Sequence, residues 1–214
     1  MDKIDDKLKQ LISSKDIQNL INKAYNTKEN VLPKKDNLFE ALKLCPLSKT
    51  KVVIFGQDPY YTKGVADGLA FSTTSYKTPL SLQNIFKQIK TEYPNCQFKS
   101  NNLSAWAKQG VLLLNSCLTV IENKPLSHSE LGWDKLIISI INLINENLEN
   151  IVFVLWGNNA KKLINLIDQT KHFVLFSAHP SPLSANKGFF GNNHFKKINQ
   201  FLIKVNKEPI DWNT

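Results

Sequence analysis

Residues 51–61 read KVVIFGQDPYY, and residues 173–184 read FVLFSAHPSPLS. Each block starts as a short apolar run, typical of a buried strand, and stops at a compact polar cluster. The first cluster carries a carboxylate, Asp58, and the second a histidine, His179, in a proline-stiffened loop with Leu183 at its tip. If both runs belong to one parallel sheet, their carboxyl ends open on the same edge. We therefore expect Asp58 and His179 to face a common crevice.

Outward from these blocks, apolar runs alternate with segments of helical spacing. Two further runs, 111–114 and 151–155, predict strands that end in polar or glycine residues. The segments of helical spacing are 3–25, 37–44, 81–93, 131–148, 160–167 and 195–205. This alternation predicts a single α/β domain over 1–214, with a central four-stranded parallel sheet flanked by helices on both faces. Residues 1–20 are expected to form an N-terminal helical extension.

The composition is that of a globular protein with an unusual charge. The 214 residues suffice for one domain, and the hydrophobic and charged fractions of 42% and 21% are ordinary. The net charge is +9, and all 27 basic residues are lysine, since the chain has no arginine. A basic excess suggests a polyanionic partner such as nucleic acid. The alternative is a lysine bias from an AT-rich genome.

The cysteines and the N-terminus predict a cytoplasmic protein without a membrane partner. Cys45, Cys96 and Cys117 lie far apart and form neither a C-x-x-C pair nor a disulfide framework. The apolar runs are too short to span a bilayer. The first residues, MDKIDDKLKQLISS, contain acids and no apolar core, unlike a signal peptide.

The residues in the polar clusters limit the reactions that this site could catalyse. The chain has no dinucleotide or NTP fingerprint and no G-x-S-x-G nucleophile elbow. Nor does any His, Cys or acidic group have metal-ligand spacing, so we expect no metal and no cofactor. A carboxylate, an imidazole, amides, aromatic rings and hydroxyls remain. This set suits hydrolysis through a cationic intermediate, with the histidine hydrogen-bonding a departing anion.

These motifs resemble those of the uracil-excising uracil-DNA glycosylases. GQDPYY is similar to that family's water-activating motif, and HPSPLS is identical to its leucine-loop motif. The resemblance spans about residues 20–205. Its other parts are VLPKKDNLFEALKLCPLSKTKVVI before the first motif, GLAFST at 68–73, GVLLLNSCLTV at 110–120, LGW at 131–133, LWG at 155–157 and GFFG at 188–191.

The resemblance implies two catalytic residues and four that contact the base. Asp58 would orient the attacking water and stabilise the oxocarbenium-like sugar, and His179 would donate to uracil O2. In the base pocket, Tyr60 would exclude thymine's methyl group and Asn115 would bind uracil N3–H and O4. The remaining two contacts would be stacking by Phe71 and a backbone contact from Gln57.

The same resemblance implies a set of DNA contacts. Leu183 would enter the minor groove and occupy the space left by the flipped nucleotide. Hydroxyls and an amide would hold phosphates without reading sequence. These phosphate-binding residues would be Ser81, Asn158, Ser181 and Ser184.

Each of these residues also has a structural interpretation. Asp58 with Pro59 is compatible with an ordinary turn, and Tyr60 and Phe71 with core packing. Asn115 is compatible with a cap at the end of a strand. His179 is compatible with a loop brace and Leu183 with a loop anchor. The ordered combination of residues, rather than any single one, favours the functional interpretation. His128 and His194 are expected to be structural.

The sequence departs from the family pattern at three places. Tyr61 stands where the family usually has histidine, so this side chain cannot become cationic. The loop that compresses the DNA backbone is proline-poor, with only Pro79 in SYKTPLSL. Asn158 replaces the serine of the expected Gly-Ser pair. These departures concern DNA affinity more than chemistry, because Asp58 and His179 are retained.

The resemblance implies a monofunctional hydrolase of base excision repair. The enzyme would flip uracil out of single- or double-stranded DNA, hydrolyse its N-glycosidic bond and leave an abasic site. It would be a monomer, with a DNA-mimicking protein inhibitor of the family as a further partner. Two alternatives remain: a DNA-binding or interaction protein on the same fold that has lost catalysis, and a lysine-rich general nucleic-acid binder.

Overall fold

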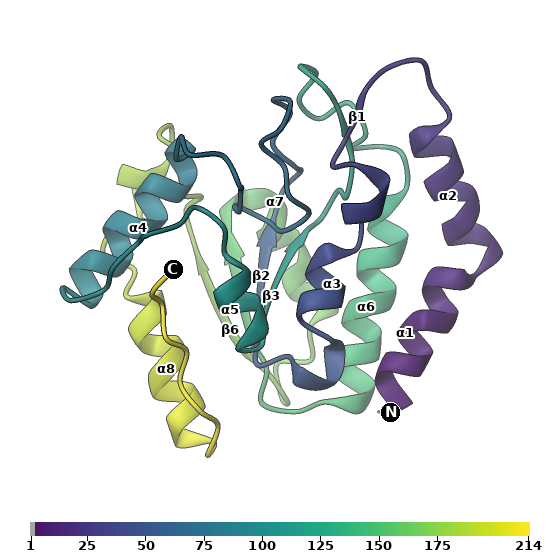
Figure 1. The fold of residues 1–214 in the computed structure, drawn as a ribbon. Helices are drawn as coiled ribbons and strands as arrows, with labels where there is room; N and C mark the ends of the chain where they lie inside the picture. The colour runs from purple at the N-terminus through teal and green to yellow at the C-terminus, as the bar shows by residue number, and fades with distance from the viewer. Residues whose placement is uncertain (1–2) are drawn as a thin grey trace.

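Four parallel strands form the central sheet of the computed structural model, which describes residues 3–214 (Figure 1). Their spatial order is β3-β2-β5-β6. The strands are β2 (Val52–Gly56), β3 (Val111–Asn115), β5 (Val152–Trp156) and β6 (Phe173–Ser177). β3 and β5 lie within one residue of the predicted runs 111–114 and 151–155, β2 and β6 lie in the two blocks quoted first, and the predicted α/β fold class is confirmed.

Helices cover both faces of this sheet, so β2, β3 and β5 are buried along their whole length. On one side α6 (Trp133–Asn147) packs against α1 (Lys3–Ser13). On the other, α4 (Leu80–Glu92) packs against α8 (His194–Lys204) (Figure 1). Burial on both faces explains why these strands read as continuous apolar runs rather than as alternating ones.

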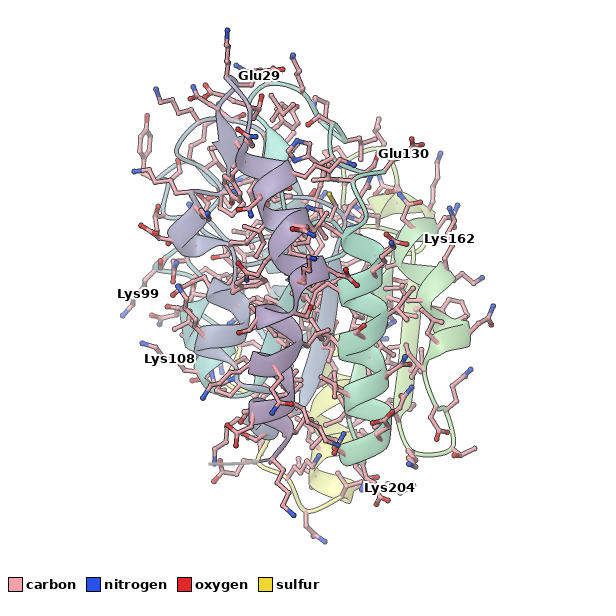
Figure 2. All side chains as sticks on the ribbon, turned by 90° about the vertical axis from the view of Figure 1, so that its right-hand side faces the viewer. Glu29, Lys99, Lys108, Glu130, Lys162 and Lys204 are labelled. Atoms are coloured by element: carbon pink, nitrogen blue, oxygen red, sulfur yellow. The ribbon has the colours of Figure 1, made fainter. Side chains whose placement is uncertain are left out.

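The N-terminal segment contains two helices, so the prediction of one helix over 3–25 is wrong. The chain breaks at Ser14, whose backbone is extended and whose Oγ accepts a hydrogen bond from the Ile17 N–H at 3.5 Å. Serine in this position caps a new helix, α2 (Lys15–Tyr25), and interrupts the previous one. Figure 2 shows α1, α2 and α6 on one face of the molecule.

Several short elements differ from the predictions. The predicted helix over 160–167 is α7 (Gly157–Lys161) followed by a 3₁₀ turn over Lys162–Leu166. The sequence did not predict the antiparallel pair β1 (Val31–Leu32) and β4 (Val120–Ile121), or α5 (Ser104–Lys108). Strands of two residues are too short to show an alternating pattern. The predicted helix over 37–44 is shorter, α3 (Glu40–Leu44), after a 3₁₀ turn over Lys35–Asn37.

Two sequence predictions concern the N-terminus and the membrane. Residues 1–2 of the predicted N-terminal extension lie outside the described residues. Within residues 3–214, no helix has both the length and the apolar character needed to cross a bilayer.

Candidate active site

The carboxyl ends of the four strands meet at one edge of the sheet. Gly56 at the end of β2 pairs with Asn115 at the end of β3, and Trp156 of β5 pairs with Ser177 of β6. The chain leaves each strand here, so the polar clusters that follow the apolar runs gather on this edge. The parallel pairing therefore places four motifs that are far apart in the sequence at one site.

A cavity of about 150 Å³ opens at this edge between β2, β3 and the loop after β6. Asp58 and His179, which are 121 positions apart in the sequence, both line it. The cavity also brings together the other four residues expected at the base, and one expected phosphate ligand. These residues are Gln57, Tyr60, Phe71, Asn115 and Ser81.

Asp58 is a partly buried carboxylate held by a backbone donor. Its Oδ2 accepts a hydrogen bond from the Leu126 N–H at 3.0 Å. Burial raises the pKa of Asp58 above its usual range, while this hydrogen bond opposes the shift. Leu126 was not predicted from the sequence, because its contribution is a backbone N–H that every residue except proline possesses.

The loop that carries Leu126 is braced by a buried polar cluster. Thr119 Oγ1 lies 2.8 Å from His128 Nδ1 and accepts a hydrogen bond from Trp133 Nε1 at 2.7 Å. The Cys117 thiol donates to the carbonyl of His128 at 3.2 Å. These bonds hold His128, two residues after Leu126, in a buried position.

Two aromatic residues form one wall of the cavity. The hydroxyl of Tyr60 donates to the Phe71 carbonyl at 3.1 Å, and burial raises the pKa of Tyr60. Phe71 has a φ of 65°, an uncommon backbone conformation for a bulky side chain. Its ring meets Trp156 edge-on, with centroids 5.6 Å apart, and lies 5.7 Å from the imidazole of His179.

A buried acidic network supports the segment around Phe71. Asp67 accepts hydrogen bonds from the Ser72 hydroxyl at 2.6 Å, from Asn102 Nδ2 at 2.9 Å and from the Leu69 N–H at 3.2 Å. Burial raises the pKa of Asp67, and these donors oppose the shift. A strained backbone persists only where the surrounding structure holds it in place. The hydrogen bonds of Asp67 hold the segment on both sides of Phe71, which explains how this residue keeps its positive φ.

The Asn115 side chain lies against a glycine that leaves room for it. Asn115 is only 8% exposed. A Cβ added to Gly56 would lie 2.2 Å from Asn115 Oδ1, so no larger residue fits beneath the amide. The Gln57 backbone is held next to it, because its carbonyl accepts from the Cys117 N–H at 2.9 Å and from the Ser116 hydroxyl at 3.0 Å.

His179 has a defined proton position. Its Nδ1 accepts a hydrogen bond from the Ser181 N–H at 3.0 Å. A nitrogen that accepts carries no proton, so the neutral ring holds its proton on Nε2. Burial lowers the pKa of His179, which favours this neutral form near pH 7. Gly157 makes room for the residue, because a Cβ there would lie 2.9 Å from His179 Cβ.

The loop after His179 exposes Leu183 and holds its serines inside. Leu183 is 86% exposed. Ser184 Oγ donates to the His179 carbonyl at 2.8 Å and lies 2.9 Å from Ser181 Oγ. Asn84 of α4 donates to the Pro180 carbonyl at 2.8 Å. The loop is therefore fixed at its base, while its apolar tip projects into solvent.

Asn158 lines a second cavity of about 130 Å³, which shares Gly56, Gln57 and His179 with the first. All the site residues expected from the sequence thus lie on one edge of the sheet or on the loop attached to it.

His194 lies deeper, where its Nδ1 accepts from Trp156 Nε1 at 3.1 Å and burial lowers its pKa to about 4. Among residues 3–214, no group of three or more His, Cys, Asp or Glu side chains is placed to hold a metal ion.

Known proteins with sequences similar to this chain come from one family. The profile of the Uracil DNA glycosylase superfamily matches residues 42–203. The uracil-DNA glycosylase of Mycoplasmopsis pulmonis is 49% identical over 86% of this chain and 83% of its own. That of Clostridioides difficile is 47% identical over 88% of this chain and 84% of its own.

Solved structures agree with this match. The mimivirus uracil-DNA glycosylase has a TM-score of 0.90 at 28% identity and covers 100% of this chain and 88% of that one. A variant of the mimivirus protein was solved in complex with UGI. The UNG of Nitratifractor salsuginis, with a TM-score of 0.68 at 16% identity over 92% of this chain and 91% of its own, shares the fold.

Proposed function

The chain belongs to the Uracil DNA glycosylase superfamily, and on that premise we propose which of its residues perform the family's reaction. It is a monofunctional hydrolase that excises uracil from DNA during repair. One observation carries the residue assignments: a single cavity joins the Asp58 carboxylate, the Asn115 amide and the His179 imidazole.

The target nucleotide leaves the DNA stack and enters this cavity, because the glycosidic bond is out of reach inside a duplex. The volume of about 150 Å³ is small beside the roughly 300–1,000 Å³ of pockets for drug-sized ligands. It suits one pyrimidine and excludes a base pair. Base flipping therefore precedes the chemistry.

Asp58 and His179 act on opposite ends of the bond that breaks. Asp58 orients a water molecule toward C1′ and stabilises the positive charge that develops on the sugar. As the N-glycosidic bond breaks, its electron pair stays with the uracil, and the water oxygen bonds to C1′. The water proton passes to Asp58, whose raised pKa favours acceptance. The Nε2–H of neutral His179 donates to uracil O2, where negative charge gathers.

Base choice follows from the shape and polarity of the walls. The Asn115 amide presents one donor and one acceptor, which match uracil O4 and N3–H but not the cytosine edge. The Tyr60 ring occupies the space beside C5 and excludes the methyl group of thymine. Phe71 stacks on the base, and the Gln57 backbone contacts it.

The rim of the site holds the DNA. Leu183 inserts into the minor groove, where an apolar wedge offsets part of the cost of unstacking. The remaining contacts go to phosphates and carry no sequence information. They come from Ser81, Asn158, Ser181 and Ser184.

The test is an excision assay on an oligonucleotide with one uracil, in EDTA, followed by alkali. We expect strand breakage at the uracil only after alkali, far slower uracil excision with Asp58→Asn, and no breakage on the matching thymine oligonucleotide. Breakage before alkali, or a need for added divalent metal in the chemical step, would contradict the proposal. Binding without breakage by the wild type would favour a non-catalytic DNA-binding protein.

Three further properties belong to this proposal. A DNA-mimicking protein inhibitor binds the same face, by analogy with the UGI complex of the mimivirus relative, and added UGI should block excision. The location is cytoplasmic, since the free, buried cysteines Cys45, Cys96 and Cys117 suit a reducing compartment. The described part of the expected N-terminal extension, residues 3–20, is helical and lies outside the matched family region, and the enzyme acts as a monomer.

A further inference from the structure

A large basic depression adjoins the catalytic cavities. It has a volume of about 520 Å³ and lies where β5 and β6 end, between α7 and the start of α8. It shares Gly157 and Asn158 with the second cavity, which in turn shares His179 with the first. The three hollows are therefore neighbours along the carboxyl edge of the sheet, with the base pocket at one end of the row.

The lining of this depression carries positive charge alone. It includes Lys161, Lys187 and Lys197, and within the described part of the chain none of its lining residues has a carboxylate. Its one histidine, His194, is neutral near pH 7 because burial lowers its pKa to about 4. A hollow with three ammonium groups and no acid attracts a polyanion.

An exposed aromatic ring stands in the same depression. Phe176, near the end of the edge strand β6, is 54% exposed, although its neighbour Leu175 is buried. The ammonium group of Lys161 lies 4.7 Å from the centroid of the Phe176 ring. A ring that is about half exposed beside a lysine keeps a face on which a base can stack.

We propose that this depression is a binding site for single-stranded DNA that continues the strand carrying the uracil. Phe176 stacks on a base of that strand, and Lys161 moves from the ring to a phosphate, while Lys187 and Lys197 contact neighbouring phosphates. An aromatic ring beside lysines in a groove is the usual combination for holding single strands without sequence preference. This site rests on the proposed function, because the strand is the one whose uracil enters the base pocket.

The contiguity with the catalytic cavity favours DNA over a general anion site. An isolated phosphate would need the lysines but not the ring, whereas a polynucleotide uses both. A free base would use the ring but not the lysines. The arrangement fits a chain in which bases and phosphates alternate.

The test compares excision from a uracil trinucleotide with excision from a single strand of roughly twelve nucleotides, since such sites span about 4–16 nucleotides. The ratio of kcat/KM on the long strand to that on the trinucleotide should fall about tenfold in Phe176→Ser, as expected from the loss of one stacked base. Phe176→Tyr should restore the ratio, since tyrosine also has a stacking face, but Phe176→Leu should not.

Salt dependence separates the two kinds of contact. Lys161→Ala and Lys187→Ala should each lower the slope of log Kd against log salt for single-stranded DNA by about 0.7. Phe176→Ser should weaken binding but leave this slope unchanged.

Matched controls come from the far end of α8, where Ile203 is 60% exposed and Lys204 lies roughly 10 Å of helix beyond Lys197. Figure 2 places Lys204 at the lower end of the molecule, away from Lys162, the neighbour of Lys161.

Ile203→Ser and Lys204→Ala should keep the wild-type ratio and slope. An unchanged ratio in Phe176→Ser, or an equal change in the Ile203→Ser control, would overturn the proposed strand site. An unchanged slope in both lysine variants would do the same. Failure of the wild type to excise uracil from either substrate would instead overturn the proposed function, so the two failures are distinguishable.

Discussion

The backbone N–H of Leu126 lies 3.0 Å from Asp58 Oδ2 and donates a hydrogen bond to it. Leu126 has a φ of 62°, a left-handed conformation that costs a bulky residue roughly 1–3 kcal/mol. The adjacent Ser127 hydroxyl accepts a hydrogen bond from the Ile121 N–H at 2.8 Å and so holds the turn in place. The strained turn aims a backbone donor at one oxygen of the carboxylate.

Removing this donor should shift the pH dependence of the reaction. With the α-hydroxy acid analogue of leucine at position 126, an ester oxygen replaces the N–H while the side chain and the backbone conformation are kept, so the pKa of Asp58 should rise further. The acidic limb of the kcat profile should then move to higher pH. Leu126→Gly keeps the N–H and tolerates the positive φ, so its limb should stay at the wild-type position. Identical profiles in the two variants, with matching circular dichroism, would show that this hydrogen bond does not tune Asp58.

Replacing Asp58 by Asn should lower activity and raise stability. Burial raises the folded-state pKa of Asp58, so stability falls as pH rises from the unfolded pKa through the folded one. At pH 7 the ionised side chain therefore destabilises the fold, and Asp58→Asn removes this penalty while keeping an acceptor for the Leu126 N–H.

We expect kcat to fall by about 10²- to 10⁴-fold. The Tm of Asp58→Asn should exceed that of the wild type at pH 7, and the difference should shrink below about pH 4, where the unfolded carboxyl group is protonated. Single-turnover rates and calorimetry at both pH values test this. A lower Tm for the variant at pH 7 would contradict the sign.

Gly56→Ala should impair recognition of the base indirectly, by displacing the Asn115 side chain. The added Cβ would lie 2.2 Å from Asn115 Oδ1 and 2.8 Å from Ala70 Cβ, so the Asn115 amide must move. Excision should fall as far as in Asn115→Ala, because a displaced amide leaves the polar edge of uracil unpaired in a desolvated pocket. Gly64→Ala is a control for backbone strain alone: its φ of 73° disfavours alanine, but nothing lies within 4 Å of its added Cβ, so stability should fall while excision by the folded enzyme is kept. Wild-type activity in Gly56→Ala would mean that Asn115 does not read the base.

Tyr60→Ala should admit thymine. Removal of the ring opens space for the C5 methyl group, so slow thymine excision should appear in a single-turnover assay. Tyr60→Phe loses only the hydroxyl that donates to the Phe71 carbonyl, and it should still reject thymine. If Tyr60→Ala rejects thymine as completely as Tyr60→Phe, the ring is not the steric barrier.

Leu183→Ala should lose more activity on duplex than on single-stranded uracil DNA. The exposed side chain matters where a base must be held out of an intact stack, and unstacking costs less in a single strand. Ile203→Ala, at another exposed apolar residue, should change neither rate. Equal losses on the two substrates would assign Leu183 to loop packing instead.

Much of this site could be predicted from the order of the residues. Asp58, Asn115 and His179 each follow a short, continuous apolar run that ends at polar or glycine residues, a pattern that favours a buried strand. Parallel strands bring their carboxyl ends to one edge, so residue type and position along the chain were enough to gather them. The break at Ser14 was missed because the helical spacing of apolar residues continues across it.

The sequence by itself determined the α/β sheet, the set of reactive side chains and the edge on which they meet, because burial of apolar strands fixes these features for the whole chain. Only the tertiary structure decided which backbone N–H faces Asp58, how closely Gly56 lies beneath Asn115 and that Lys161 covers an exposed Phe176. Every residue but proline carries an N–H, and a glycine or lysine looks the same in any surroundings. The direction of such groups depends on how distant segments pack, which no local pattern records.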